Sequence, residues 1–407
     1  MNSVKTADPI LAPTVDSDVI ARPRAAAPQR LLSLDVLRGL TIAFMILVND
    51  QIGPHPFKEL SHAAWNGFTA TDLVFPTFLF LVGISTVLST QSRLSRGATR
   101  SELLLHTGRR TILLIAFGFV VNNFPLFHLS SARYYGVLPR IAICYFVVAA
   151  LYLISPGWKD KVAIAIACLI GYWMLMRFVP VPGYGVPTHQ IPINDHDLNL
   201  TAWLDRHIFS ARHLYERTRD PEGLLSTIPS IATTLFGVLA ALWLRTTQST
   251  TRKAALIAAA GILCLMLGLA WNPFFPINKK LWTSSFTLYA GGWSLLLLAA
   301  SIAVIDIWRI GRDTAPPETS AHHPLLYKPI LVFGTNAILA YMISELGEGV
   351  LRTIRHNGVP LTRLFYPTIA HYLASPPWAS LLYSLAFVFT CWLLVLPFYR
   401  KRIFLRI

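Results

Sequence analysis

Charged side chains are scarce in this 407-residue chain: Asp, Glu, Lys and Arg together make up 14% of it, whereas hydrophobic residues make up 54%. So few charges exclude an ordinary pair of soluble domains, which a chain of this length could otherwise form. Apolar stretches of about 20 residues, long enough to cross a bilayer as helices, recur along the sequence instead. The composition therefore predicts an all-α, polytopic transmembrane helix bundle.

Cysteines and cofactor motifs are also few. The four cysteines each lie alone within an apolar segment, so we expect neither a disulfide framework nor a paired metal site. The histidines show no ligand spacing that would select a metal. A Walker loop, a dinucleotide-binding fingerprint, an H-E-x-x-H helix and a G-x-S-x-G elbow are all missing. We therefore predict no metal and none of the activities for which these motifs are diagnostic.

The net charge of +15 does not indicate a nucleic-acid partner, because the Lys and Arg residues are spread through short connectors and not gathered in one basic domain. The positive-inside rule explains this pattern better. With an even number of spans, most of these residues fall on the side of both termini, which we assign to the cytoplasm. Residues 1–30 lack the basic and then apolar pattern of a cleaved signal peptide, and their Pro, Ala and Asp content predicts a disordered cytoplasmic tail.

Ten apolar stretches are long enough to span a membrane. They lie near 34–52, 71–91, 111–129, 137–155, 161–179, 223–245, 254–271, 281–308, 329–346 and 378–397. Two connections, 180–222 and 347–377, are too long to be simple turns, and this topology places both on the outer side. Long ordered loops often carry function. We treat residues 31–407 as one transmembrane domain.

The first span carries ionisable residues where they are costly. Asp35 and Arg38 are three residues apart, so they share a helix face and can form an ion pair. Asn49 lies on the same face, about 16 Å beyond Arg38 at 1.5 Å per residue. Two interpretations remain open: a structural pair that ties the helix into the bundle, or one wall of a polar tunnel. In the second, Arg38 and Arg30 would meet an anionic ligand entering from the cytoplasm.

Polar residues also gather at the predicted outer surface. In "HAAWNG", His62 precedes an ordered turn at Trp65 and Asn66, and we expect Asp72 to cap the second span through one of its first amide groups. Further polar or aromatic residues follow on later spans: Asp220, Glu222, Asn278, Lys280, Trp282, Asn336 and Glu345. Helix capping or snorkelling explains each one alone. Their recurrence on one side predicts a site.

Five stretches together resemble a known family. They are, in this order, "SLDVLRGLTIAFMILVN", "HAAWNGFTATDLVFPTFLFLVGIS", "GVLPRIAICYFVVAAL", "DPEGLLSTIPSIATTLFGV" and "PINKKLWTSSF". The sequence is similar to the transmembrane domain of heparan-α-glucosaminide N-acetyltransferase and its bacterial relatives, from about residue 30 to the C-terminus. The resemblance implies that residues 31–407 form an integral-membrane acyltransferase. Such an enzyme takes acetyl groups from cytosolic acetyl-CoA and delivers them to the amine of a glucosamine-like sugar across the membrane.

The resemblance also implies residue roles. The active-site histidine of the family falls on His62, the asparagine beside it on Asn49, and a position near the cofactor on Arg140 of "GVLPR". The acetyl-CoA site would also include Arg30, Asp35 and Arg38. The sugar would meet Trp65, Asn66, Asp72, Glu222, Asn278, Lys280, Trp282 and Asn336. His62 can deprotonate the amine or attack the thioester itself, and both routes stay open. Asn49 can donate to the developing oxyanion.

Other consequences of the resemblance are a possible homodimer and a setting among membrane lipids. The chain lacks the extra N-terminal region and span of the animal enzyme, from which we expect a bacterial cytoplasmic (inner) membrane. Two alternatives to amine acetylation remain. One is an amino-sugar transporter that uses the same outer pocket, and the other is an O-acetyltransferase of an envelope glycan. The sequence leaves the acceptor open.

Overall fold

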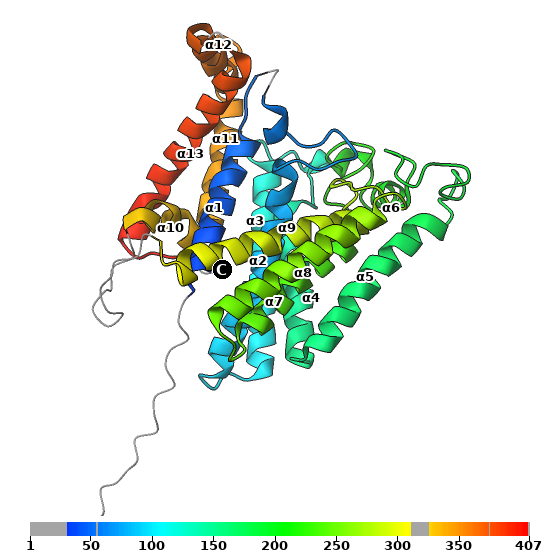
Figure 1. The fold of residues 1–407 in the computed structure, drawn as a ribbon. Coiled ribbons are helices and arrows are strands. Elements are labelled where there is room, and N and C mark those ends of the chain that lie inside the picture. Colours follow the sequence, from blue (N-terminus) through cyan, green and yellow to red (C-terminus); the bar gives the residue numbers. More distant parts are fainter. Residues whose placement is uncertain (1–30, 54–55, 311–324, 374, 406–407) are drawn as a thin grey trace, which may run out of the picture. The chain divides into compact units, whose positions relative to one another are not determined.

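The structure, a computed structural model, describes residues 31–53, 56–310, 325–373 and 375–405. All of its helices and strands lie in the unit Leu32–Ile407. Within the described residues, nine helices are long and apolar enough to cross a membrane, and a bent pair would make a tenth span. Apart from one short β-hairpin, the regular structure in this part of the chain is helical (Figure 1). The prediction of an all-α polytopic bundle is confirmed.

The helices follow the predicted spans closely. The nine spanning helices are α1 (Leu32–Asn49), α2 (Val74–Leu94), α3 (Arg100–Asn123), α4 (Val137–Ile154), α5 (Trp158–Phe178), α7 (Thr227–Leu244), α8 (Thr250–Trp271), α9 (Ser284–Ile302) and α13 (Pro376–Arg400). The bent pair is α10 (Lys328–Thr335) and α11 (Ala337–Thr353). The two long connections have elements of their own: α6 (Leu200–Phe209), β1 (Arg355–His356), β2 (Val359–Pro360) and α12 (Leu361–Leu373).

The third span, Arg100–Asn123, both starts and ends earlier than the predicted 111–129. It starts earlier because α3 begins with a capped polar turn. Thr99 Oγ1 accepts a hydrogen bond from the amide of Glu102 at 3.3 Å, and the Glu102 carboxylate accepts one from the amide of Thr99 at 2.8 Å. This reciprocal capping box stabilises the first turn of a helix. A search for apolar runs misses such turns, since they are helical but charged.

The ninth predicted span, 329–346, is broken at Asn336, where α10 and α11 meet at 84°. Asn336 has non-helical backbone angles, φ −127° and ψ 42°. Its side chain bonds to the segment after α13: Oδ1 accepts from the amide of Leu405 at 3.2 Å, and Nδ2 donates to the carbonyl of Ile403 at 3.3 Å. The break is thus stabilised by residues far along the chain, which a local hydropathy pattern does not register.

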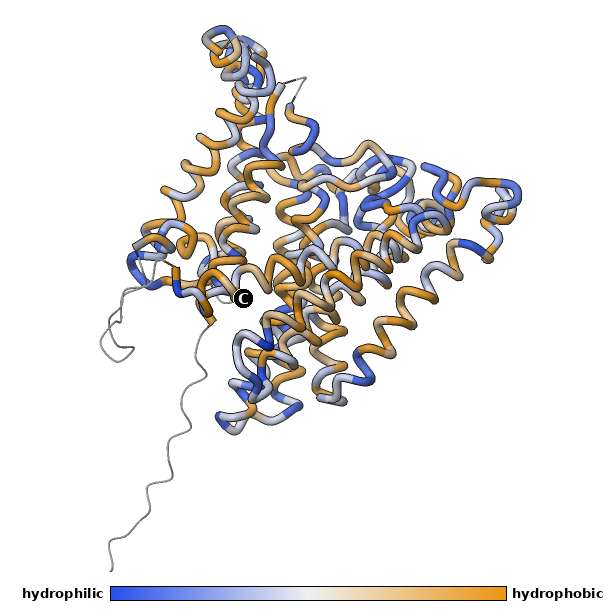
Figure 2. The backbone as a smooth tube through the Cα atoms, in the orientation of Figure 1, coloured by the Kyte–Doolittle hydropathy of each residue, from blue (hydrophilic) through white to orange (hydrophobic). Residues whose placement is uncertain are grey.

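Helices α2 and α7 are the most buried spans, and they cross at two glycines. Gly83 packs against the carbonyl oxygen of Thr234, and Gly237 against that of Phe80, so closely that a Cβ at either glycine would collide with backbone. Small residues allow this approach in a membrane. By contrast, at most 28% of the residues in the apolar stretches of α3, α5, α8 and α13 are buried, and Figure 2 shows α5, α8 and α13 as hydrophobic along much of their length. These helices supply lipid-facing surface.

We expect Gly237→Ala to destabilise the bundle, because the added methyl group must push α2 away from α7. Overpacking of this kind costs about 1–3 kcal/mol. Thermal unfolding in detergent measures the effect as a lowered midpoint. The matched control is Gly171→Ala on α5, where an added Cβ meets no atom within 4 Å and alanine favours the helix. Equal midpoints for the two variants would contradict the close crossing.

Candidate active site

Four connections between helices meet at one end of the bundle. They are 50–73 (described except for residues 54 and 55), 124–136, 179–226 and 272–283. The amide of Gly67 in the first donates to the carbonyl of Ile277 in the fourth at 2.9 Å, and Arg133 in the second forms an ion pair with Asp220 in the third. Gly67 has φ +120°, a conformation that favours glycine. Side chains from distant parts of the sequence are thereby brought to the residues around His62.

His62 is held by a buried carboxylate. Its Nδ1 lies 2.7 Å from Oδ1 of Asp72, whose side chain is 1% exposed. The other carboxylate oxygen, Oδ2, accepts from the amide of Ala63 at 3.2 Å, and from the amide and hydroxyl of Thr69 at 3.0 and 3.1 Å. A carboxylate with three such donors is stabilised in its ionised form. We infer that it holds the proton on Nδ1 and leaves the lone pair on Nε2.

Asp72 does not cap α2, contrary to the sequence-based expectation. It lies in the 3₁₀ turn Thr71–Leu73 before that helix, and the N-cap position of α2 is Leu73, which makes no side-chain cap bond. The Asp72 carboxylate turns back toward the preceding loop and bonds to groups there. A capping aspartate and an aspartate that orients a histidine have the same sequence signature, because both precede a helix. Asp72 therefore belongs to the His62 site.

Lys279 is the second partner of the imidazole, and it was not among the predicted site residues. Its Nζ lies 3.3 Å from Nε2 of His62. The next residue, Lys280, was predicted instead, but its Nζ bonds to Glu216 at 3.0 Å. In "NKKLW" the two lysines cannot be told apart by pattern. Their different directions result from the turn that precedes α9.

The electrostatics around His62 favour a neutral imidazole. Burial lowers the pKa of His62 and the charge of Lys279 lowers it further, against the opposing effects of Asp72 and Glu222. Burial also lowers the pKa of Lys279, which Glu222 and Asp72 partly restore. The His62 side chain is still 43% exposed, so a reactant can reach it. A neutral, reachable imidazole with a basic Nε2 can serve as a general base or as a nucleophile.

Removing the charge of Lys279 should raise the pKa of His62, because a positive neighbour disfavours the protonated imidazole. Diethyl pyrocarbonate reacts with neutral imidazole, so its rate of reaction with His62, followed by mass spectrometry as pH varies, reports that pKa. In Lys279→Met the midpoint should move to higher pH. The adjacent variant Lys280→Met is the control, since Lys280 pairs with Glu216. A midpoint that stays in place in Lys279→Met would show that the lysine does not act on His62.

A buried ion-pair network lies next to this pair. Arg133 Nε and Nη2 donate to the two carboxylate oxygens of Asp220 at 2.8 and 2.6 Å, and Nη2 also donates to Glu222 at 2.7 Å. Burial raises the pKa of Glu222, but the charge of Arg133, assisted by Lys279 and Arg140, outweighs it and holds the pKa below its usual value. Glu222 is therefore ionised and contributes negative charge near His62. The sequence around Arg133, "SSARYYGV", contains no pattern that would predict Arg133 as the partner of Glu222.

Arg140 and Trp282 form a buried layer beneath these charges. Arg140 is fully buried at the start of α4, where Nη2 donates to the carbonyl of Gly223 at 2.8 Å and to the hydroxyl of Ser226. Its guanidinium lies 5.2 Å from the ring centre of Trp282, whose Nε1 donates to Thr233 at 3.2 Å. The Nε and Nη1 atoms of Arg140 have no hydrogen-bond partner among the described residues. Trp282 is fully buried too, so it supports the site from below.

Three predicted site residues join the loops: Trp65 and Asn66 bond to Asn194, and Asn66 also bonds directly to Asn278. Asn66 Oδ1 accepts from Asn194 at 2.8 Å and from Asn278 at 3.2 Å, while Trp65 Nε1 donates to the Asn194 carbonyl at 2.8 Å. The Trp65 ring also stacks on His196 at 3.9 Å between ring centres. In this structure these residues hold the loop 180–222 against the His62 loop.

The structure separates Asp35 and Arg38 from this cluster. Arg38 Nη1 pairs with Asp35 at 2.9 Å and Nη2 donates to Ser85 at 2.9 Å, near the start of α1, whereas Asn49 is its last residue. The Asn49 side chain lies within hydrogen-bonding reach of Glu345. The predicted Asp35–Arg38 ion pair is present.

Two of the predicted site residues remain, Arg30 and Asn336. Arg30 lies outside the described residues. Asn336 is not brought to His62, since its side chain bonds to the segment after α13. Among the described residues, no group of three or more His, Cys, Asp and Glu side chains could hold a metal ion.

Comparisons with known proteins place this arrangement in a family. The model of the family described as heparan-alpha-glucosaminide N-acetyltransferase, catalytic, matches residues 30–272, which is more than half of the chain. The chain belongs to this family. The heparan-alpha-glucosaminide N-acetyltransferases of Homo sapiens and Mus musculus are 31% and 30% identical to it over 379 and 401 residues. The matched regions cover 80% and 86% of this chain, and 54% and 57% of those proteins.

The chain therefore spans about half the length of the curated relatives that it matches. Within the region that matches the heparan-alpha-glucosaminide N-acetyltransferase family model lie His62, Asp72, Arg140 and Glu222. Lys279 lies beyond it, in the connection before α9. The family assignment thus covers the His62–Asp72 pair, and the structure adds the lysine.

Proposed function

We propose that the chain is an integral-membrane acetyltransferase that moves an acetyl group from acetyl-CoA to the amine of a glucosamine-like sugar. One observation carries the proposal: His62 is held by a buried carboxylate at Nδ1 and presents a basic Nε2 at the site surface. The pair lies in the family's catalytic region. A histidine oriented in this way performs acyl transfer in many unrelated enzymes.

The chemistry at His62 is a proton transfer coupled to acyl transfer. As the amine nitrogen attacks the thioester carbonyl, Nε2 takes a proton from that nitrogen, the carbon–sulfur bond breaks, and the thiolate of CoA leaves. Asp72 stabilises the imidazolium that forms. In the alternative route Nε2 attacks first, and acetyl-imidazole then transfers its acetyl group to the amine. Labelled acetyl-CoA without acceptor distinguishes the two, since only the second route leaves label on His62.

The charges near His62 suit a cationic amino sugar. Ionised Glu222, held by Arg133, attracts an ammonium group toward the imidazole. Lys279 occupies the side of Nε2 that the amine must approach, so the amine replaces the lysine contact. Asn49 is the proposed donor to the oxyanion, and its side chain lies near Glu345. Trp65, Asn66 and Lys280 would shape the rim of the acceptor site, and the buried side chains of Asp72, Asn278 and Trp282 would support it from within.

The donor would enter from the opposite end of α1, which we assign to the cytoplasm together with both termini. Asp35, Arg38 and Arg30 would lie along its path, and the distance of about 16 Å from Arg38 to Asn49 matches a pantetheine arm in length. Arg140 would lie at the thioester end, and its bond to the carbonyl of Gly223, next to Glu222, supports this role. The proposed location is a bacterial inner membrane, with the amino sugar on its outer face.

We expect His62→Ala to lower the turnover number for acetyl transfer from labelled acetyl-CoA to glucosamine by at least about a hundredfold, the usual contribution of a positioned base. The assay uses purified protein in proteoliposomes, with donor and acceptor on opposite sides. His106→Ala is the control, because His106 lies in the first turns of α3, at the other end of that helix from the site.

Wild-type turnover in His62→Ala would remove the histidine from the mechanism. Uptake of glucosamine in the absence of acetyl-CoA, without acetylated product, would instead indicate a transporter. Acetylation of a hydroxyl group, detected by its lability to mild base, would indicate an O-acetyltransferase.

A further inference from the structure

The side-chain amine of Lys279 lies where the amine of an acceptor must come. Its Nζ is 3.3 Å from Nε2 of His62, the atom to which the proposed reaction assigns the chemistry. A general base takes a proton from a nucleophile that lies at about hydrogen-bonding distance. Lys279 is also partly exposed, so a thioester that reaches His62 can reach this amine as well. The chain thus holds an amine of its own beside the imidazole.

The two neighbouring lysines differ in their ion pairs. Nζ of Lys280 pairs with a carboxylate oxygen of Glu216 at 3.0 Å, whereas no carboxylate oxygen of the described residues lies within 4 Å of Nζ of Lys279. A close carboxylate stabilises the ammonium form of a lysine, and an ammonium group has no lone pair with which to attack. Of the two lysines, Lys279 is therefore the one that can act as a nucleophile.

The surroundings of Lys279 favour the neutral amine. Burial lowers the pKa of Lys279, and the charges of Arg140 and Lys280 lower it further, against the opposing effects of Glu222 and Asp72. Lysines become nucleophiles in proteins when desolvation or a neighbouring cation lowers the pKa in this way. A neutral amine beside a basic imidazole is also the arrangement that an amino sugar must form before it can be acetylated.

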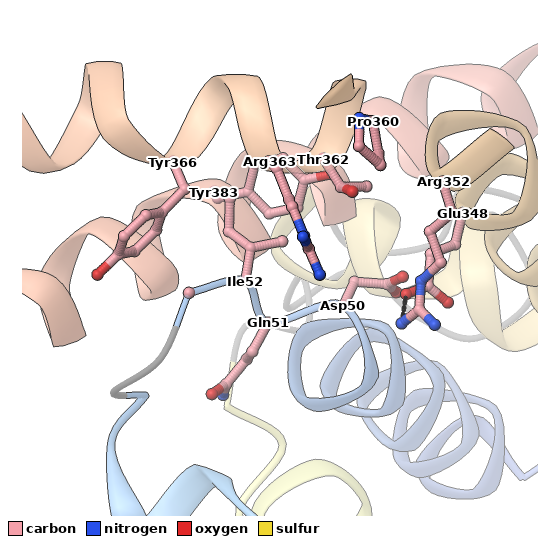
Figure 3. A pocket seen from close by; sticks show the side chains of 11 residues that line it. Asp50, Gln51, Ile52, Glu348, Arg352, Pro360, Thr362, Arg363, Tyr366 and Tyr383 are labelled. Carbon is pink, nitrogen blue, oxygen red and sulfur yellow. Dashed lines mark ion pairs between the residues drawn. The ribbon is translucent and has the colours of Figure 1, made fainter. Parts of the chain in front are cut away.

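The cavity that borders the same segment of chain offers no competing amine. It has a volume of about 740 Å³, and its wall residue Gln51 donates from Nε2 to the carbonyl of Leu60 at 3.2 Å, two residues before His62. Figure 3 shows carboxyl, guanidinium and phenol groups around it, and no lysine is among the eleven described residues that line it. Guanidinium groups stay protonated in proteins. Lys279 is thus the amine that the structure places at the imidazole.

We propose that Lys279 is a self-acetylation site, which takes the acetyl group of acetyl-CoA when no acceptor sugar is bound. The inference rests on the proposed function. The neutral Nζ attacks the thioester carbonyl carbon, Nε2 of His62 takes one proton from Nζ, the carbon–sulfur bond breaks, and the thiolate of CoA leaves. The product is an amide, which is far less reactive than a thioester, so the acetyl group stays on the lysine.

Acetylation of Lys279 slows the transfer to sugar for two reasons. The acetamide is larger than an ammonium group and remains beside Nε2, where the sugar amine must approach. It also carries no charge, so Lys279 no longer opposes the effects of Asp72 and Glu222, and the pKa of His62 rises. A bound sugar displaces the lysine from the imidazole and thereby protects the enzyme from this modification.

Labelling of the whole protein tests the site. The purified protein is incubated in detergent with acetyl-CoA that carries an isotope label in its acetyl group, and peptide mass spectrometry locates the label. Lys279 should be acetylated at least about tenfold more than Lys58, because its amine is held beside a base. Lys58 is an exposed lysine of the connection that carries His62 and reports uncatalysed acetylation. Excess glucosamine, or His62→Ala, should reduce the labelling of Lys279 to the level of Lys58.

Lys279→Arg connects the modification to activity, because arginine keeps the positive charge and its guanidinium group is not acetylated. Incubation with acetyl-CoA alone should lower the later initial rate of the wild-type protein in proportion to the acetylated fraction of Lys279. The Lys279→Arg variant should keep the initial rate that it has without this incubation. Lys280→Arg is the matched control and should lose rate as the wild-type protein does.

The two ways in which the inference can fail are distinguishable. Lys279 labelled no more than Lys58, in a preparation that acetylates glucosamine, would overturn the self-acetylation site and leave the proposed function in place. Acetylation of neither glucosamine nor Lys279 would overturn both. Equal loss of rate in wild-type protein and Lys279→Arg would show that another group is modified, and would also overturn the site.

Discussion

The hydrogen bond between His62 and Asp72 is the interaction on which the rest of the site depends. A histidine in a loop would sample many orientations, but a carboxylate that is 1% exposed, with three further donors on its second oxygen, leaves the ring one position. Asp72 is fixed in turn by the start of α2, a helix that is buried along most of its length against α7. The close packing of α2 against α7 at Gly83 and Gly237 therefore helps to fix the orientation of His62, although His62 itself lies in a loop.

Opposite charges balance around that pair. Asp72 and Glu222 favour protonation of His62, whereas Lys279 and burial disfavour it. Arg133 holds Glu222 ionised, and Arg140 lies beneath it with two nitrogens left without partners in the described structure. Because acidic and basic side chains alternate around His62, most of these buried charges have a partner of opposite sign, which offsets the cost of burying them. It also leaves a neutral imidazole between an anionic and a cationic neighbour, which is the state a proton acceptor needs.

Much of the fold was predictable from the sequence, because span length and hydropathy depend on local composition. The spans agree with the helices except where a charged but capped turn lengthens α3, or where the segment after α13 stabilises the break at Asn336. The site was predictable in part. His62, Asp72 and Glu222 lie in one region as expected, but the choice between Lys279 and Lys280, and the pairing of Arg133, depend on contacts between residues many positions apart. No local pattern encodes those contacts.

The most direct test of the account is the turnover number of Asp72→Asn for acetyl transfer to glucosamine. The asparagine keeps the size of the side chain and loses its charge, so the imidazole loses both its fixed tautomer and the stabilisation of its protonated form. The account predicts a loss of at least about a hundredfold with a thermal midpoint that still reports a folded bundle. Turnover equal to that of the wild-type protein would show that the His62–Asp72 bond supports only the loop, and would contradict the central claim.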